Sequence, residues 1–154
     1  MAVLDVSAAA IDRAKSRTGE LADRVRWIVS DVTEIGELGT FDVWHDRAVF
    51  HFLTADEDRR KYIALALRSV APGGHLVIGT FGVTGPEKCS GLPVERYDRS
   101  TLAAAFGAGF EMVKSFEATH TTPWGKPQVF FFAVMRRVAR GSEAVKSHAQ
   151  GEPS

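Results

Sequence analysis

The residues best suited to chemistry stand in one run, Trp44-His45-Asp46-Arg47, which follows an apolar stretch that begins at Phe41. An unperturbed imidazole has a pKa of about 6.5, so His45 is suited to act as a general base near neutral pH. Asp46 is suited to orient that imidazole or to bind a cation, and Arg47 to hold a carboxylate. Burying titratable groups unpaired is costly, so their place directly after a predicted buried strand indicates a site. We therefore predict catalytic roles for His45, Asp46 and Arg47.

Two acidic residues stand at the ends of predicted strands, Asp5 in the strand at residues 2–6 and Asp31 after the strand at residues 25–29. The two oxygens of a carboxylate match the two hydroxyls of a ribose, which makes Asp5 a candidate for ribose binding. Asp31 is a candidate for contact with the amino group of an adenine, with Val32 against the ring. The plain alternatives are a helix-capping acid for Asp5 and an Asx-turn for Asp31.

The elements that would position these residues alternate between strand and helix. Strands are predicted at residues 2–6, 25–29, 41–44, 75–81, 110–118 and 128–137, and helices at 8–15, from 54 onward, and 102–106. This order predicts an α/β fold with a Rossmann-like, mainly parallel sheet, helices on both faces and one antiparallel strand near the C-terminus. Val3, Val29, Val43 and Val77 are expected on neighbouring strands of this one sheet.

Several local signals mark where elements begin and end. Ser7 is a predicted cap of the first helix, Asp98 or Ser100 of the last, and Thr54-Ala55-Asp56-Glu57 has the form of a capping box. Pro72-Gly73-Gly74 is predicted to be a turn.

The loop at residues 82–96 follows a predicted strand and lies where a lid over a crevice would lie. Cys89 within it is interpreted as a small apolar filler, because nothing indicates a lowered thiol pKa. His51 lies in an apolar run and is expected at the interface between helix and sheet.

The bulk properties describe one ordinary soluble domain at residues 1–138, followed by a polar tail at 139–154. The 19 basic and 19 acidic residues balance, so the sequence lacks the excess of basic residues that is typical of nucleic-acid-binding proteins. The single cysteine excludes an internal disulfide and a zinc site built on several cysteines, and no metal site is predicted. No apolar run approaches the length of a membrane helix and no signal peptide is recognisable, so cytoplasmic residence is expected.

With these residues placed, the chain resembles the class I S-adenosylmethionine-dependent methyltransferases over roughly residues 2–138. The resemblance rests on Val3–Ser7, Ser30–Val32, Phe41–Leu53, Ala71–Ile78, Cys89–Pro93 and Tyr97-Asp98. It implies methyl transfer from S-adenosylmethionine to a small-molecule or protein acceptor. The cofactor-binding residues that we then expect are Asp5, Val6, Asp31, Val32 and Trp44.

The chain departs from the family pattern at its start. Members begin with a strand and a Gly-rich loop that carries the methionine end of the cofactor, whereas this chain begins at the family's second strand. In the family order the missing strand lies between those that contain Leu4 and Val43. We therefore expect a truncated methyltransferase domain, crippled in activity, with exposed strand edges. These edges would close by direct pairing of the two strands or by insertion of a strand from a second chain in a homodimer.

Two other functions stay open from the sequence. A nucleotide-dependent oxidoreductase of the Rossmann type also places acids after successive strands, although Pro72-Gly73-Gly74 before a strand favours the methyltransferase. A non-catalytic interaction module derived from a methyltransferase would keep the half-sheet and bind no cofactor. The acceptor is left unidentified among small acids, amines, thiols and protein lysines.

Overall fold

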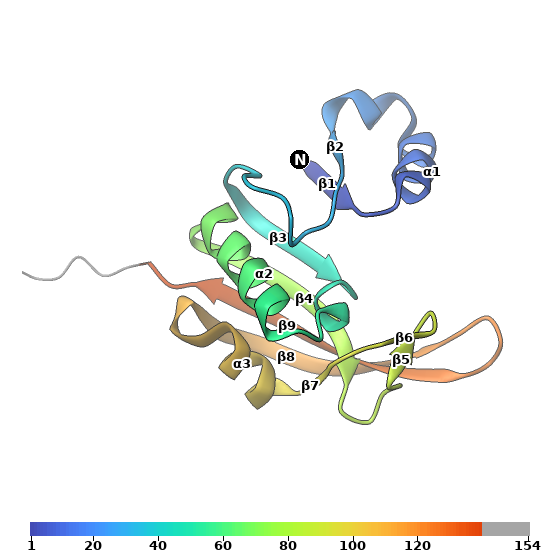
Figure 1. Cartoon of the computed structure of the whole chain (residues 1–154), viewed down its shortest axis with the longest axis vertical. Helices are drawn as coiled ribbons and strands as arrows, with labels where there is room; N and C mark the ends of the chain where they lie inside the picture. Colours follow the sequence, from blue (N-terminus) through green and yellow to red (C-terminus); the bar gives the residue numbers. More distant parts are fainter. Residues whose placement is uncertain (140–154) are drawn as a thin grey trace, which may run out of the picture.

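The computed structural model describes residues 1–139, so the predicted polar tail lies almost wholly outside the described residues. The α-helices are α1 (Ala8–Thr18), α2 (Asp56–Ser69) and α3 (Arg99–Phe106). The strands are β1 (Ala2–Asp5), β2 (Arg26–Val29), β3 (Phe41–Arg47), β4 (Val70–Gly82), β5 (Lys88–Cys89), β6 (Leu92–Pro93), β7 (Arg96–Tyr97), β8 (Phe110–Thr121) and β9 (Pro127–Arg137). The earlier part of the described chain contains two strand–helix–strand units, β1-α1-β2 and β3-α2-β4 (Figure 1).

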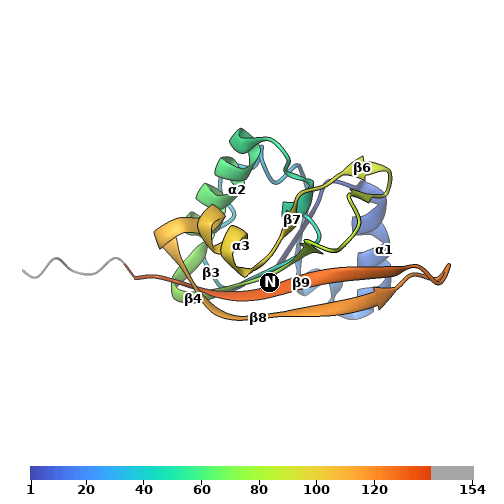
Figure 2. The same ribbon diagram turned by 90° about the horizontal axis from the view of Figure 1, so that it is seen from below.

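The larger sheet has the strand order β3-β4-β9-β8, with β7 beside the end of β4. Strand β3 is parallel to β4, whereas β9 is antiparallel to both β4 and β8. This confirms the predicted α/β class with a single antiparallel strand near the C-terminus. Helices α2 and α3 lie together on one face of this sheet (Figure 2).

The prediction of one continuous sheet was wrong, because β1 and β2 form a separate parallel pair. Figure 1 shows this pair and α1 set apart from β3. Direct pairing of the strands at Leu4 and Val43, one of the two expected closures, is also absent. Within residues 1–139 no strand hydrogen-bonds to the outer edge of β1 or of β3, so no strand joins the two sheets.

Backbone geometry shows which groups face those open edges. Ala48 N–H donates to the Gly79 carbonyl oxygen at 2.8 Å. Because successive peptide groups of a strand point to opposite sides, those of Val43, His45 and Arg47 point away from β4. By the same alternation, the bond from Ser30 N–H to the Asp5 carbonyl oxygen leaves the peptide groups of Leu4 pointing away from β2.

The main core lies between the helices and the larger sheet. Leu76 and Ile78 of β4 are fully buried there. Burial of each such side chain contributes about 1.5–3 kcal/mol of hydrophobic free energy. The other core members include Tyr62, Leu102, Phe106, Ala133 and Met135. The opposite face exposes apolar side chains, with 57% of Val43 and 49% of Phe116 accessible to solvent.

Two of the predicted helix caps are confirmed and one is wrong. Ser7 Oγ accepts from Ala10 N–H at 3.2 Å, and the Asp98 carboxylate accepts from Thr101 N–H at 2.8 Å. For α2 the N-cap is Ala55 rather than Thr54, and its side chain makes no capping bond. The first helical bond runs from Arg59 N–H to the Ala55 carbonyl oxygen, so the helix begins one residue later than predicted.

The predicted turn at Pro72-Gly73-Gly74 was also wrong, because β4 already begins at Val70 and runs through it. Pairing with β3 shifts here, from Val70 opposite Phe41 to His75 opposite Val43. Gly73 has a φ of 79°, which glycine adopts without steric cost. The glycine therefore makes an irregularity within the strand and does not reverse the chain.

Candidate functional site

The two predicted nucleoside-binding acids lie side by side at the carboxyl ends of β1 and β2. Asp5 is the last residue of β1, and its carbonyl oxygen accepts from Ser30 N–H at 3.1 Å, directly before Asp31. Asp5 Oδ1 accepts from Ser7 N–H at 2.7 Å, and Asp31 Oδ1 accepts from Thr33 N–H at 2.8 Å. Both side chains are exposed, and within the described residues only Oδ1 of each is engaged.

These bonds fix the orientation of the two carboxylates. Hydrogen bonds from the Thr33 backbone and side chain lower the pKa of Asp31, which is therefore ionised at neutral pH. The local turns were the plain alternatives for both acids, yet they leave the second oxygen of each free. Of the apolar neighbours, Val6 is 71% exposed, whereas Val32 is half-buried and packs against the core.

The Trp44-His45-Asp46-Arg47 run is divided between the two faces of β3. Side chains alternate along a strand, and Trp44 and Asp46 lie on the face toward α2. The Trp44 ring meets that of Tyr62 edge-on, with centroids 5.7 Å apart. His45 and Arg47 are exposed on the opposite face. The four residues therefore do not form one cluster, and the roles predicted for His45 and Arg47 stay predictions.

Asp46 holds the turn that follows β3. Its side chain is buried, and Oδ1 accepts from Val49 N–H at 2.9 Å. Oδ2 accepts from Phe50 N–H at 3.1 Å and from the Tyr62 hydroxyl at 2.6 Å. Burial raises the pKa of Asp46, although these hydrogen bonds act in the opposite direction. The carboxylate is thus committed to protein donors, and its contacts are those of a positioning residue.

Tyr62 is a hydrogen-bond partner of Asp46 that we did not predict from the sequence. It is fully buried, and burial together with the neighbouring Asp46 raises its pKa well above the usual value. The buried residues of α2 are Tyr62, Leu65, Ala66 and Ser69. A tyrosine in such a stripe needs a partner for its hydroxyl, and this signal would have indicated a buried acceptor.

His51 lies in the turn that follows β3 and contacts the edge of β4, and its expected place between helix and sheet stays a prediction. Its side chain is fully buried, and Nδ1 accepts from Phe81 N–H at 3.2 Å. Burial lowers the pKa of His51 to about 4, so the imidazole is neutral at physiological pH.

Residues 83–96 form a strap over the carboxyl end of β4, where a lid was predicted. The strap contains the short antiparallel pair β5 and β6, with the half-buried Cys89 opposite Leu92. At its end, Glu95 N–H donates to the His51 carbonyl oxygen at 2.8 Å.

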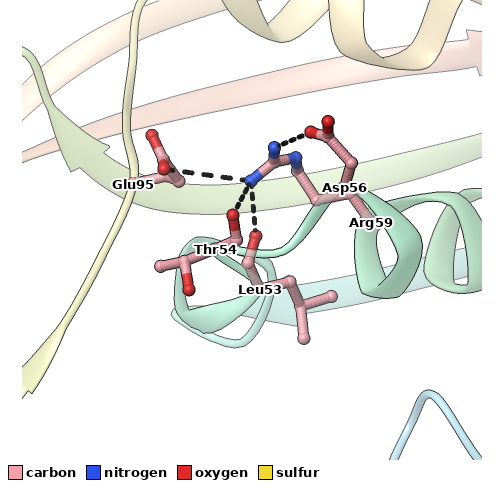
Figure 3. Close-up of polar contacts among 5 residues, drawn as sticks. All are labelled: Leu53, Thr54, Asp56, Arg59 and Glu95. Carbon is pink, nitrogen blue, oxygen red and sulfur yellow. Dashed lines mark hydrogen bonds and ion pairs between the residues drawn. The ribbon is translucent and has the colours of Figure 1, made fainter.

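Arg59 joins the strap to the turn that follows β3 (Figure 3). Its Nη1 donates to the carbonyl oxygens of Leu53 at 2.9 Å and Thr54 at 2.8 Å, and lies 3.9 Å from a Glu95 carboxylate oxygen. Its Nη2 pairs with Asp56. From the sequence, only the spacing of Arg59 from the turn could have suggested these contacts.

A surface hollow lies away from the predicted site residues. Its lining residues are Glu37, Leu38, Gly39, Thr40, Arg68 and Ser69, which places it at the start of β3 and the end of α2. Ligand sites of open α/β sheets lie at the opposite, carboxyl ends of strands. Within residues 1–139 no helix is long and apolar enough to span a membrane.

Comparison with known proteins finds similarity to methyltransferases. Residues 1–74 match the methyltransferase domain family. Nodulation protein S of Rhizobium tropici is 36% identical over 80 residues, which are 52% of this chain and 33% of that protein. The chain thus spans about a third of this curated relative.

Solved structures show the same fold. The N-methyltransferase NodS from Bradyrhizobium japonicum WM9 superposes with a TM-score of 0.69 at 20% identity, covering 90% of this chain and 73% of that one. A 1,6-didemethyltoxoflavin-N1-methyltransferase from Burkholderia thailandensis, solved with S-adenosylhomocysteine, gives 0.69 at 21% identity, covering 90% and 61%. The sequence match over residues 1–74 and the shared fold both agree with the resemblance to the class I S-adenosylmethionine-dependent methyltransferases.

Proposed function

We propose that this domain transfers a methyl group from S-adenosylmethionine to a small-molecule or protein acceptor. The observation that carries the proposal is the pair of exposed, ordered carboxylates, Asp5 and Asp31, at adjoining strand ends. The free oxygen of Asp5 suits ribose hydroxyls and that of Asp31 suits the adenine amino group. The exposed Val6 offers an apolar contact for the ring. These residues fit the nucleoside half of the cofactor.

The cofactor supplies an electrophilic methyl on a sulfonium, and the protein supplies position and proton transfer. His45 is exposed at the carboxyl end of β3 and is proposed to take a proton from the acceptor. Arg47, on the same face two residues on, is proposed to hold an acceptor carboxylate. Asp46 and Tyr62 are proposed to act by holding the turn that follows β3. Trp44, which we predicted to bind the cofactor, packs against the Tyr62 ring on the helix-facing side of β3.

The open edges of β1 and β3 support a further element of the proposal, a homodimer in which these edges are covered. Unpaired strand edges are templates for pairing with another chain. Residence in the cytoplasm remains our expectation. The oxidoreductase alternative is not favoured by the family match.

Calorimetric titration with S-adenosylhomocysteine tests the nucleoside assignment. Replacement of Asp5 by Ala should weaken binding by about 1–3 kcal/mol, the scale of lost hydrogen bonds to a charged group. Asp12→Ala, which removes another exposed carboxylate on α1, is the matched control and should leave the affinity unchanged. If Asp5→Ala and the parent bound S-adenosylhomocysteine with equal affinity, Asp5 would not bind the ribose.

A further inference from the structure

The His51 imidazole has one nitrogen in use and one without a partner. Because Nδ1 accepts a hydrogen bond from Phe81 N–H, the neutral ring carries its proton on Nε2. Nε2 is buried and has no hydrogen-bond partner in the described structure. An unpaired buried donor is destabilising, and native proteins satisfy nearly all such groups.

The position of the ring gives this free N–H a direction. Strand β3 pairs with β4 as far as Gly79, and β7 pairs with it from Phe81 onward. The imidazole therefore occupies the edge of β4 between the two neighbouring strands. Since the two ring nitrogens diverge, the Nε2–H points away from β4 at the carboxyl end of the sheet, where ligands of open α/β folds bind.

A second unpaired polar atom lies at the same strand end. Thr80 Oγ1, one residue before the Phe81 that contacts His51, is buried and has no partner in the described structure. The strap closes this region through the bond from Glu95 N–H to the His51 carbonyl oxygen. Arg59 of α2 pairs with the Glu95 side chain at the same end of the strap. Two buried polar atoms without a partner in the described structure, both at the carboxyl end of β4, indicate a site that a ligand completes.

We propose that His51 Nε2–H binds an oxygen atom of the methyl acceptor beneath the strap, with Thr80 Oγ1 as a second contact. The proposal rests on the proposed function only in naming the ligand as the methyl acceptor. A neutral N–H donor pairs with an oxygen lone pair and not with an ammonium group. The acceptor class is therefore a small carboxylate, phenol or alcohol.

The test uses the chain without cofactor and follows the imidazole nitrogens by NMR. Sodium acetate and phenol are the probes, and methylammonium chloride at equal ionic strength is the control. We expect the Nε2-protonated tautomer, and a saturable shift of its signal with acetate or phenol but not with methylammonium. His51→Gln should abolish the response. His75→Gln, at the other end of β4, should retain it and serves as the matched control.

Three outcomes would overturn the proposal: a proton on Nδ1, an Nε2–H that contacts a long-lived water and ignores every probe, or an equal response to methylammonium. Failure of the proposed function is read separately, because it appears as an absence of S-adenosylhomocysteine binding. A chain that shows the acetate shift but binds no S-adenosylhomocysteine would keep the oxygen site and lose the methyltransferase assignment.

Discussion

Asp46, which we predicted to be catalytic, holds the backbone that presents its neighbours. Its carboxylate accepts from the Tyr62 hydroxyl of α2 and from Val49 N–H and Phe50 N–H, which follow Ala48 with its φ of 64°. A non-glycine residue in this region is strained and needs support from its surroundings. The three donors supply that support.

Replacement of Asp46 by Ala should lower the free energy of unfolding by roughly 3 kcal/mol, because three donors lose their acceptor in a buried place. Asp46→Asn, which keeps one acceptor oxygen, should cost less. Tyr62→Phe removes one donor only and should cost about 1 kcal/mol. Urea denaturation measures all three. If Asp46→Ala were as stable as the parent, the turn would not depend on these bonds.

His51 should make the stability of the fold depend on pH. Its folded pKa of about 4 lies below the ordinary 6.5, so below pH 6.5 the unfolded chain binds the proton first. Stability should therefore fall as pH falls from 6.5 to 4, by up to about 3 kcal/mol. The raised pKa of Asp46 gives the opposite slope above its ordinary value of 3.8, so the comparison uses a variant.

His51→Gln retains an acceptor for Phe81 N–H and removes the titration. Urea denaturation of parent and variant from pH 7 to 4 should show that only the parent loses this stability. Parallel curves for the two proteins would mean that His51 is protonated in the folded state.

At the residue scale, the sequence predicted which residues stand at strand ends but not what their side chains contact. The positions of Asp5 and Asp31 follow from short apolar runs that end in an acid. The division of Trp44–Arg47 between two faces follows from strand alternation, but only once β3 is known to continue to Arg47. The contact between Asp46 and Tyr62 joins residues 16 positions apart and depends on how α2 packs.

At the scale of elements, most helices and strands could be placed from apolar periodicity and caps, whereas strand pairing could not. Ser7 and Asp98 identify their helices because each side chain bonds locally. The separation of β1–β2 from β3 depends on hydrogen bonds between segments distant in sequence, and the one-sheet expectation missed it. The capping-box pattern at Thr54 failed because Ala55 supplies the N-cap with its backbone alone.

The open edge of β3 should be visible in amide exchange, residue by residue. Trp44, Asp46 and Ala48 direct their N–H groups toward β4 and should exchange slowly. Val43, His45 and Arg47 direct theirs to the open side and should exchange much faster. Exchange followed by NMR at low protein concentration measures the alternation. Uniform protection would show that the edge is paired, and a doubled mass in light scattering would then assign the pairing to the proposed homodimer.

Arg59 should control how firmly the strap is held, and Cys89, the single cysteine, reports on it. Arg59→Lys keeps the charge but loses the planar fork that reaches the Leu53 and Thr54 carbonyl oxygens. Thiol modification of Cys89 should therefore be several-fold faster in Arg59→Lys than in the parent. Arg60→Lys, one residue away on the exposed side of α2, is the control and should react at the parent rate. Equal modification rates in the parent and both variants would mean that Arg59 does not hold the strap.

At the scale of the whole molecule, the described chain offers its polar ligand groups to only one half of the proposed cofactor. Asp5 and Asp31 suit the nucleoside, while the space beyond β1 and β3 has no described strand or Gly-rich backbone to approach the methionine moiety. The expectation of a truncated, crippled domain can therefore be tested by comparing the binding of two ligands. Adenosine and S-adenosylhomocysteine share the nucleoside, so this chain should bind both with dissociation constants within a factor of about three, or about 0.6 kcal/mol.

Calorimetry on the same preparation decides this, with Asp5→Ala as the internal check. That variant should lose affinity for both ligands by the same factor, because the lost bonds are to the ribose they share. S-adenosylhomocysteine binding ten-fold tighter than adenosine, a difference of about 1.4 kcal/mol, would mean that groups within this chain already hold the methionine end. His45 and Arg47, exposed at the end of β3 on the open side, would then be the first residues to replace.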